Sequence, residues 1–206
     1  MEKIKVLVAD DHAIVRMGLV SLLGKAEDIE VVGEANSGAA AVSKAVKLNP
    51  DVAILDLAMP KMDGVAATAE LHAKLPEVKV LILTSFGTSE EISNAFAAGA
   101  HGAILKSIAN SELIAAIRKV FAGKRVVSPE IELMLANDPP VQDLSPRQRD
   151  ILESITRGLN NNQIAVQYDI SPESVKTHIE KIFEKIGAAN RSEAVAIAMR
   201  KHLLKL

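Results

Sequence analysis

The chain has 206 residues, of which 49% are hydrophobic and 24% are charged, and its formal net charge is −2. This length suits one or two domains that can each bury a core. The sequence contains no Cys, which excludes disulfides, thiol catalysis and Cys-based zinc sites. No apolar stretch reaches the length of a membrane span and no signal peptide precedes the first apolar run, so we expect a cytoplasmic protein with no membrane partner.

Short apolar runs that close on polar residues are the main pattern of the first half of the chain. The runs are 4–9, 52–55, 80–83 and 103–105, and they close on Asp10-Asp11, Asp56, Thr84 and Lys106. Such near-continuous runs predict strands of a parallel sheet that is covered on both faces. Because ligands of these sheets bind at the carboxyl edge of the strands, three carboxylates, a hydroxyl and an ammonium are predicted to meet there.

Amphipathic segments separate the apolar runs, and most of them close at a Gly or before a Pro. These segments are 13–23, 37–48, 65–75, 89–98 and 111–122. Apolar residues at helical spacing that end on such breakers predict α-helices. The alternation of strand and helix occurs five times, and the four runs named above are the strands that close on site residues. Five strands and five helices predict an α/β domain over residues 1–122, with a flavodoxin-like, doubly wound, five-stranded parallel sheet.

The polar strand ends have the chemistry of a site for a divalent cation and a phosphoryl group. Mg2+ prefers a few oxygen ligands in octahedral geometry and keeps several waters. Asp11 and Asp56 can supply such oxygens, with Asp10 placed to hold a bound water. Once the cation screens the negative charge, one carboxylate can attack phosphorus and become an aspartyl phosphate. A single acidic strand end is more often a solvated loop start, but the matching ends in this chain favour a site.

The string Asp-Leu-Ala-Met-Pro-Lys-Met-Asp-Gly, from Asp56 to Gly64, extends this pattern. With the upstream acidic pair, Thr84 and Lys106, it resembles the receiver domain of two-component response regulators over roughly residues 1–122. The resemblance implies that Asp56 is the phospho-acceptor and that Thr84 and Lys106 sense the phosphate. It also implies a Mg2+ site formed by Asp10, Asp11, Asp56 and the backbone carbonyl of Ala58.

One position departs from the receiver family. An aromatic residue usually stands three residues before the lysine and rotates inward on phosphorylation, whereas this chain has Ala103. Since no ring can swing here, we expect the switch to run through Thr84, the loop after it and Phe86. We therefore expect phosphorylation to change affinity or oligomeric state by about one tenfold step.

The pattern of strands and helices stops after Gly123. Residues 123–143 contain a Ser-Pro step, a short helical stretch at 130–136, and Asn-Asp-Pro-Pro at 137–140, which is a strong loop signal. We expect a semi-rigid linker over 123–143. The charge also changes sign: residues 1–123 hold 12 basic against 15 acidic residues, and residues 144–206 hold 10 against 7. This asymmetry is typical of an acidic regulatory domain followed by a nucleic-acid-binding one.

Four helices are predicted after the linker, within residues 144–206. Ser145-Pro146 reads as an N-cap and first helical residue, and that helix runs to about Gly158. The other three helices cover 161–168, the stretch from Ser171 to Gly187, and the stretch that Asn190 opens. They form a small all-α domain, whose second and third helices are a helix-turn-helix candidate.

This tail resembles the LuxR-type DNA-binding domain over roughly residues 142–206. The resemblance rests on the strings LSPRQR at 144–149, ISPESVKTHI at 170–179, IFEKIG at 182–187 and NRSEAV at 190–195. It implies that Lys176 and Thr177 meet the major groove with His178 near the backbone, and Glu180 and Lys181 lie on the same stretch. Asn162 and Glu180 stand where the family often has basic residues, which lowers the expected affinity for DNA.

The two resemblances together imply a DNA-binding transcription regulator, controlled by phosphorylation, of the NarL/FixJ class of response regulators. A sensor histidine kinase would supply the phosphoryl group of Asp56. Activation would favour a homodimer on double-stranded DNA. The chain would catalyse only its own aspartyl phosphorylation and dephosphorylation.

Two other classes of protein stay open. A phosphatase or mutase with an aspartyl nucleophile can share this sheet type, but many carry a second acidic residue two positions later, where this chain has Ala58. No Gly-rich phosphate loop is present, and the five His residues are scattered without the spacing of a metal site. The remaining class is an adaptor whose tail binds a protein partner, with weak or partner-dependent binding to DNA.

Overall fold

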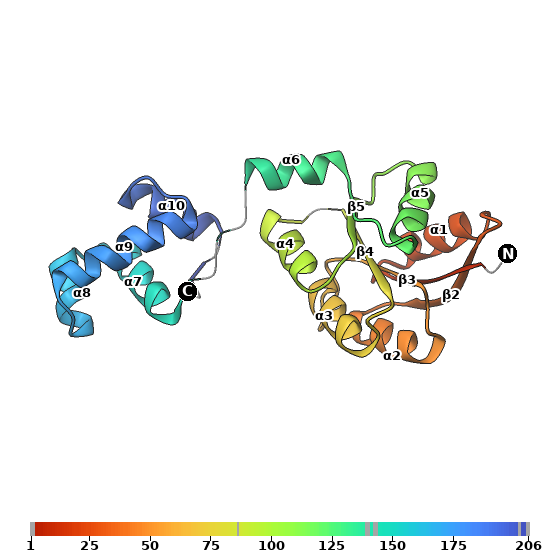
Figure 1. Cartoon of the computed structure of the whole chain (residues 1–206), viewed down its shortest axis with the longest axis horizontal. Coiled ribbons are helices and arrows are strands. Elements are labelled where there is room, and N and C mark those ends of the chain that lie inside the picture. Colours follow the sequence, from red (N-terminus) through yellow and green to blue (C-terminus); the bar gives the residue numbers. More distant parts are fainter. Residues whose placement is uncertain (1–2, 86, 139–140, 142–143, 202, 205–206) are drawn as a thin grey trace. The chain divides into compact units, whose positions relative to one another are not determined.

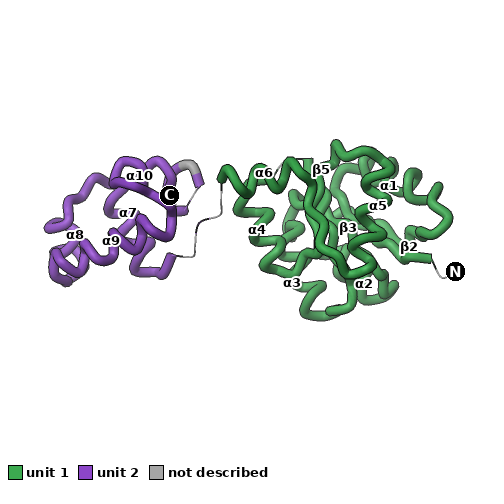
Figure 2. The backbone as a smooth tube through the Cα atoms, turned by 45° about the horizontal axis from the view of Figure 1, so that its top comes forward, with its two compact units in different colours: residues 1–140 green, residues 141–206 purple. Residues whose placement is uncertain are grey.

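The computed structural model describes residues 3–85, 87–138, 141, 144–201 and 203–204. The chain divides into two compact units, residues 1–140 and 141–206, which Figure 2 colours separately. Within the described residues, no helix is long and apolar enough to cross a membrane.

The first unit is built on one parallel sheet of six strands in the order β2-β1-β3-β4-β5-β6 (Figure 1). The strands are β1 (Ile4–Ala9), β2 (Ile29–Ala35), β3 (Val52–Leu55), β4 (Lys79–Thr84), β5 (Gly102–Leu105) and β6 (Val126–Val127). All five pairings between neighbours are parallel. The first strand of the chain lies inside the sheet, and the chain order reverses beside it, which makes the sheet doubly wound as predicted.

Six helices cover the two faces of this sheet. They are α1 (Ala13–Leu23), α2 (Gly38–Leu48), α3 (Gly64–Lys74), α4 (Ser89–Ala97), α5 (Asn110–Phe121) and α6 (Pro129–Asn137). Leu23 of α1 and Ile117 of α5 are buried on one face. Residues of α2, α3, α4 and α6 are buried on the other face. Alternate strand residues point to opposite faces of the sheet. Ala103 is therefore buried on the face covered by α2, α3, α4 and α6, and Ile104 on the face covered by α1 and α5.

The helix starts follow from local capping. The side chains of Ser37 and Asp63 accept from the amides of Ala40 and Ala66 at the starts of α2 and α3. Thr88 and Glu91 form a complete capping box at the start of α4. Each cap satisfies backbone N–H groups that have no partner in the first turn of a helix.

The segment 123–143 differs from the linker that the sequence predicts. Its first part turns at Gly123, whose φ of +75° suits Gly, and returns along the sheet as β6. Ile131 of α6 is fully buried in the core of the first unit. Most of the segment therefore folds onto the first unit, and the sheet has six strands instead of five.

The second unit consists of four helices, α7 (Pro146–Thr156), α8 (Asn161–Tyr168), α9 (Pro172–Ile186) and α10 (Arg191–Arg200). Capping boxes begin α7 and α8, and Pro occupies the first position of α7 and α9. Aliphatic side chains from the four helices form one core, which includes Ile151, Ile164, Val175, Ile182 and Ala194. The all-α organisation predicted for the tail is confirmed.

Candidate functional site

The carboxyl edge of the sheet of the first unit gathers the polar strand ends. Asp10 and Asp56 follow β1 and β3 directly and are 1% and 3% exposed, and Thr84 ends β4 at 1%. Backbone hydrogen bonds hold these positions: the Asp56 amide donates to the Ala9 carbonyl at 2.8 Å, and the Lys106 amide donates to the Thr84 carbonyl at 2.7 Å. The parallel pairing therefore sets the distances between the side chains before any ligand binds.

The Lys106 ammonium bridges the two buried carboxylates. Its Nζ lies 2.6 Å from Asp10 Oδ2 and 2.8 Å from Asp56 Oδ2, and its side chain is 12% exposed. Burial raises the pKa of Asp56, against the opposing effect of the Lys106 ammonium. Burial works to lower the pKa of Lys106, but the two carboxylates outweigh it and the pKa is raised. The site holds a cation between two anions in a largely desolvated pocket.

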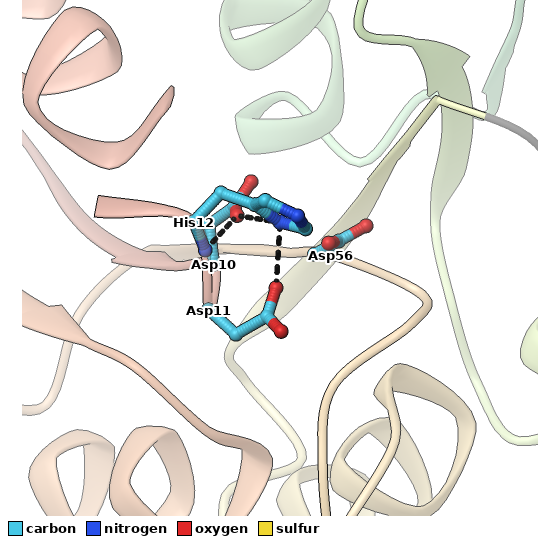
Figure 3. Close-up of side chains that lie close together, drawn as sticks. All are labelled: Asp10, Asp11, His12 and Asp56. Atoms are coloured by element: carbon cyan, nitrogen blue, oxygen red, sulfur yellow. Dashed lines mark hydrogen bonds and ion pairs between the residues drawn. The ribbon is translucent and has the colours of Figure 1, made fainter. Parts of the chain in front are cut away.

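His12 joins this acidic group, as Figure 3 shows. Its Nδ1 lies 2.7 Å from Asp11 Oδ1 and 3.4 Å from Asp10 Oδ1, and its backbone amide donates to Asp10 Oδ1 at 2.8 Å. The ligand atoms of Asp10, Asp11, His12 and Asp56 lie within 4.8 Å of one another. The spacing between His residues could not indicate this position, because the neighbours of His12 at the site are carboxylates.

The donor set fits a hard divalent cation such as Mg2+. Three carboxylates from Asp10, Asp11 and Asp56 converge within the reach of one ion, and Asp11 is the more exposed of the acidic pair. Oxygen ligands of this kind, with open positions for water, are what Mg2+ prefers. Ala58 is exposed, and its backbone hydrogen bond to Asp56 opposes, as a minor effect, the rise in the pKa that burial causes. The role of the Ala58 carbonyl as a ligand stays a prediction.

The loop after Asp56 is held close against the strand end. The Gly64 amide donates to the Leu57 carbonyl at 2.9 Å, and a Cβ at Gly64 would lie 2.4 Å from the Asp56 carbonyl oxygen. Only Gly fits this approach. Lys61 adopts a left-handed φ of +70° in the same loop. Residues 56–64 therefore form a compact loop that leads from the site into α3.

Arg16 is a site residue that the sequence pattern did not reveal. Its guanidinium donates to the Asp10 carbonyl oxygen at 2.7 Å and lies 3.4 Å from the Glu34 carboxylate. It fixes the backbone of the acidic pair from α1. Because Arg16 lies on a helix and contacts a main-chain atom, neither apolar periodicity nor a motif could identify it.

Ala103 is fully buried, and its side chain lies in the core that α4 and α6 cover. The position of the missing aromatic is thus filled by packing from other elements. Phe86, which we expected to relay the switch, lies outside the described residues. The route through Thr84 and Phe86 stays a prediction.

The raised pKa of Asp56 leads to a prediction about stability. Asp56→Asn should stabilise the metal-free protein at neutral pH, because the wild-type carboxylate is ionised in a pocket that favours its neutral form. As the pH falls through the folded-state pKa, the wild-type carboxyl takes up a proton and the advantage of the Asn variant should shrink. Thermal unfolding in EDTA across a pH series measures this. If the stability advantage of Asp56→Asn over the wild type grew as the pH fell, the raised pKa of Asp56 would be contradicted.

The second candidate interface is the outward face of α9. Lys176, Thr177, Glu180 and Lys181 are exposed on it, and His178 is half-buried. Val175, Ile179 and Ile182 point inward and are buried, as the amphipathic pattern predicts. Among the described residues, no ion pair joins Lys176 to Glu180. Asn162 is exposed on α8, a helix that carries no charged residue.

Comparison with known proteins identifies the class. The sequence model of the response regulator receiver domain matches residues 6–118, and that of the bacterial regulatory proteins of the luxR family matches residues 142–198. The response regulator protein VraR of Staphylococcus epidermidis is 40% identical over 207 residues, covering 98% of this chain and 99% of VraR. VraR of Staphylococcus aureus is 39% identical over the same shares.

Two solved structures extend the likeness. The response regulator ChrA of a heme-sensing two-component system is 38% identical, with a TM-score of 0.58 over 99% of this chain and 100% of ChrA. A structure of two RcsB dimers bound to two parallel DNAs is 25% identical, with a TM-score of 0.67 over 96% and 98% of the chains.

The chain belongs to the two-component response regulators. It combines a receiver domain with a LuxR-type helix-turn-helix domain, which is the organisation of a DNA-binding transcription regulator. The resemblance deduced from the sequence is confirmed for both parts of the chain. Receivers of this family generally use Mg2+ at an acidic pocket, and the first unit has such a pocket.

Proposed function

We propose that Asp56 is the phospho-acceptor of this response regulator and that a sensor histidine kinase supplies the phosphoryl group. The observation that carries the proposal is the buried bridge from Lys106 to Asp10 and Asp56. The Lys106 ammonium is already held between two carboxylates at the sheet edge. It can therefore donate to a phosphoryl oxygen without further preorganisation. A structural role alone would not require two buried carboxylates at one strand edge.

The transfer step uses residues already in place. A carboxylate oxygen of Asp56 attacks phosphorus, the bond from phosphorus to the kinase imidazole nitrogen breaks, and the leaving imidazole keeps the electron pair. Asp10, Asp11, Asp56 and the Ala58 carbonyl would hold Mg2+, which would supply neutralising charge for the phosphoryl group. Thr84 donates its hydroxyl to one phosphoryl oxygen, and the Lys106 ammonium pairs with another. The chain catalyses only this transfer to itself and the hydrolysis of the resulting acyl phosphate, in which water attacks phosphorus, inorganic phosphate leaves and the Asp56 carboxylate is restored.

The tail is proposed to bind double-stranded DNA through α9, as a homodimer in the activated state and in the cytoplasm. Support comes from the LuxR-type match and from RcsB, whose dimers were solved on DNA. The exposed residues Lys176, Thr177 and Lys181 form the face that would enter the major groove. His178 is half-buried beside this face and would lie near the DNA backbone.

A second candidate is a protein-binding tail with weak or partner-dependent binding to DNA. The charge of the interface favours it: α9 carries Glu173, Glu180 and Glu184 against Lys176, Lys181 and Lys185, and α8 carries no charge. Affinity for DNA depends on how many phosphates cationic side chains neutralise. A helix with balanced charge contributes little to it.

The experiment that decides between them is DNA binding with and without Mg2+ and beryllofluoride, a phosphoryl mimic. We expect beryllofluoride to tighten binding to a target duplex by about tenfold, or roughly 1.4 kcal/mol. The gain should vanish in Asp56→Asn. Binding that is absent at low salt in both states would favour the protein-binding tail.

Glu180 gives a separate prediction for the DNA interface. Glu180→Lys should tighten binding to target and random duplexes alike, because the change removes an anion and adds a cation on the face that meets phosphates. The slope of log affinity against log salt should steepen by about one unit. Fluorescence polarisation across a salt series measures both. Glu184→Lys, further along α9, is the matched comparison.

Two other results would revise the assignment of Glu180. A selective loss of affinity for the target duplex would mean that Glu180 reads a base, since a carboxylate can accept from the amino group of cytosine. No change on either duplex would place Glu180 outside the interface.

A further inference from the structure

The segment that follows α5 is attached to the edge strand β5 by its backbone. Val126 and Val127 of β6 pair with Gly102 and Ala103 of β5. The Val126 amide donates to the His101 carbonyl and the Ser128 amide donates to the Ala103 carbonyl, both at 3.1 Å. A Cβ at Gly102 would lie 2.8 Å from the Val126 carbonyl oxygen, so the two backbones are in close contact.

Helix α6 then packs over α4 and β5, and Figure 1 shows α6 beside α4. Its Ile131 is fully buried in the same core as Ala103 of β5 and Ile92 of α4, which are fully buried too. Met134 and Leu135 pack against this core from the same helix. The space above Ala103, where an aromatic side chain would need room, is therefore shared with α6.

Polar contacts attach both ends of the segment to α4. The Ser89 hydroxyl donates to Asp138 Oδ2 at 3.0 Å, and Ser89 is the first residue of α4 while Asp138 caps the end of α6. At the other end, the Arg125 guanidinium lies over the Phe96 ring, 4.1 Å from its centroid. Asp138 is three residues before Val141, where the second unit begins. The Ser89–Asp138 contact thus lies at the exit of the chain toward the tail.

The two elements that hold α6 both begin or end at the phosphoryl site. Lys106 follows β5 directly, and α4 starts five residues after Thr84. The Lys106 amide donates a hydrogen bond to the Thr84 carbonyl, so the two strand ends are linked by their backbones. A phosphoryl group on Asp56 would interact with the ammonium of Lys106 and the hydroxyl of Thr84, which stand at the end of β5 and shortly before the start of α4. Both β5 and α4 contact α6.

We propose that the α4–β5 face is a regulated docking surface whose occupant is the chain's own segment 126–138: docked while Asp56 is unmodified and released when Asp56 carries a phosphoryl group. Release lengthens the tether to the second unit and exposes the apolar surface around Ala103. The inference rests on the proposed function of Asp56. It accounts for switching without an aromatic at position 103, because α6 replaces the ring as the moving part.

Amide hydrogen exchange of the full-length protein, read by mass spectrometry, tests the proposal. With Mg2+ and beryllofluoride, exchange within 129–138 should accelerate by about tenfold or more, since release opens the backbone of α6. Peptides of α2, which lies on the same face of the sheet but beside β2 at the opposite edge, should not change. Asp56→Asn should show no acceleration in α6.

Two variants test the docking contacts directly. Ala103→Tyr puts a ring into the core in which Ile131 is buried, so α6 should exchange fast without beryllofluoride. Ala73→Tyr, on the exposed side of α3, is the matched control and should leave α6 protected. Ser89→Ala removes only the hydrogen bond to Asp138 and should speed exchange at the end of α6, whereas Ser111→Ala at the exposed start of α5 should not. If Ala103→Tyr fails to fold by circular dichroism, the Ser89 variant still decides.

The outcomes separate the two proposals. If beryllofluoride changes exchange at the ends of β4 and β5 but leaves 129–138 protected, the docking proposal is overturned while the function of Asp56 stands. If wild type and Asp56→Asn are identical in every peptide, the function of Asp56 fails and the docking proposal falls with it. Slow exchange of α6 in both Ala103→Tyr and Ser89→Ala would also overturn it.

Discussion

Asp56→Asn is expected to reduce labelling by acetyl phosphate in Mg2+ to background, because the amide nitrogen and oxygen cannot form a stable bond to phosphorus. The wild-type protein should take up phosphate in a form labile to strong acid, to base and to hydroxylamine, as an acyl phosphate is. Asp11→Ala should also abolish uptake at low Mg2+, because it removes a carboxylate from the cation site. Radiolabel retained on the protein measures the effect.

Asp63→Asn is the matched comparison for the acceptor. Asp63 lies in the same loop and its side chain caps α3 through the Ala66 amide, a role that Asn can also fill. Labelling should persist in that variant. Undiminished labelling of Asp56→Asn would refute the assignment of the acceptor.

Lys106→Met is expected to destabilise the metal-free receiver by about 3–5 kcal/mol, because two buried carboxylates lose the cation between them. Mg2+ should restore much of the lost stability, because it binds the folded state. At a concentration a hundred times the dissociation constant, this binding stabilises the folded state by about 2.7 kcal/mol. Urea unfolding followed by circular dichroism, in EDTA and in Mg2+, measures both effects.

Lys74→Met is the control for the loss of a lysine charge. Lys74 pairs with Glu70 one helical turn away on the exposed side of α3, a contact worth a few tenths of a kcal/mol. Asp56→Asn added to Lys106→Met should restore stability in EDTA. An equal, small loss in the Lys106 and Lys74 variants would show that the bridge contributes no more than a surface pair.

The convergence of the site could be predicted because it follows from topology. Apolar runs in parallel strands place their next residues at one edge, and the distances from Lys106 to Asp10 and Asp56 agree with that prediction. The capping residues Ser145 and Asn190 likewise predicted two helix starts in the tail. The structure has α7 and α10 beginning directly after them. These are local signals, in which a few neighbouring residues determine the outcome.

What the sequence could not reveal depends on contacts between distant parts of the chain. Strand β6 has two residues, which is too short for any periodicity, and it forms only because β5 offers its free side. Ile131 of α6 is buried in the same core as Ala103 of β5, which is far from it in the sequence. The turn of His12 toward the acidic pair is a side-chain orientation, which no spacing rule encodes. The roles of the site residues, as distinct from their positions, remain predictions to be tested by the experiments above.

The pairing of β6 with β5 also decides where the receiver can be cut from the chain. An open strand edge presents unpaired amides and carbonyls that promote association with other chains. Here the carbonyls of His101 and Ala103 are already occupied by the segment after Gly123. A fragment that stops at residue 122 would expose that strand edge and the apolar core in which Ile131 is buried. It should aggregate at concentrations where a fragment ending at residue 138 stays monomeric.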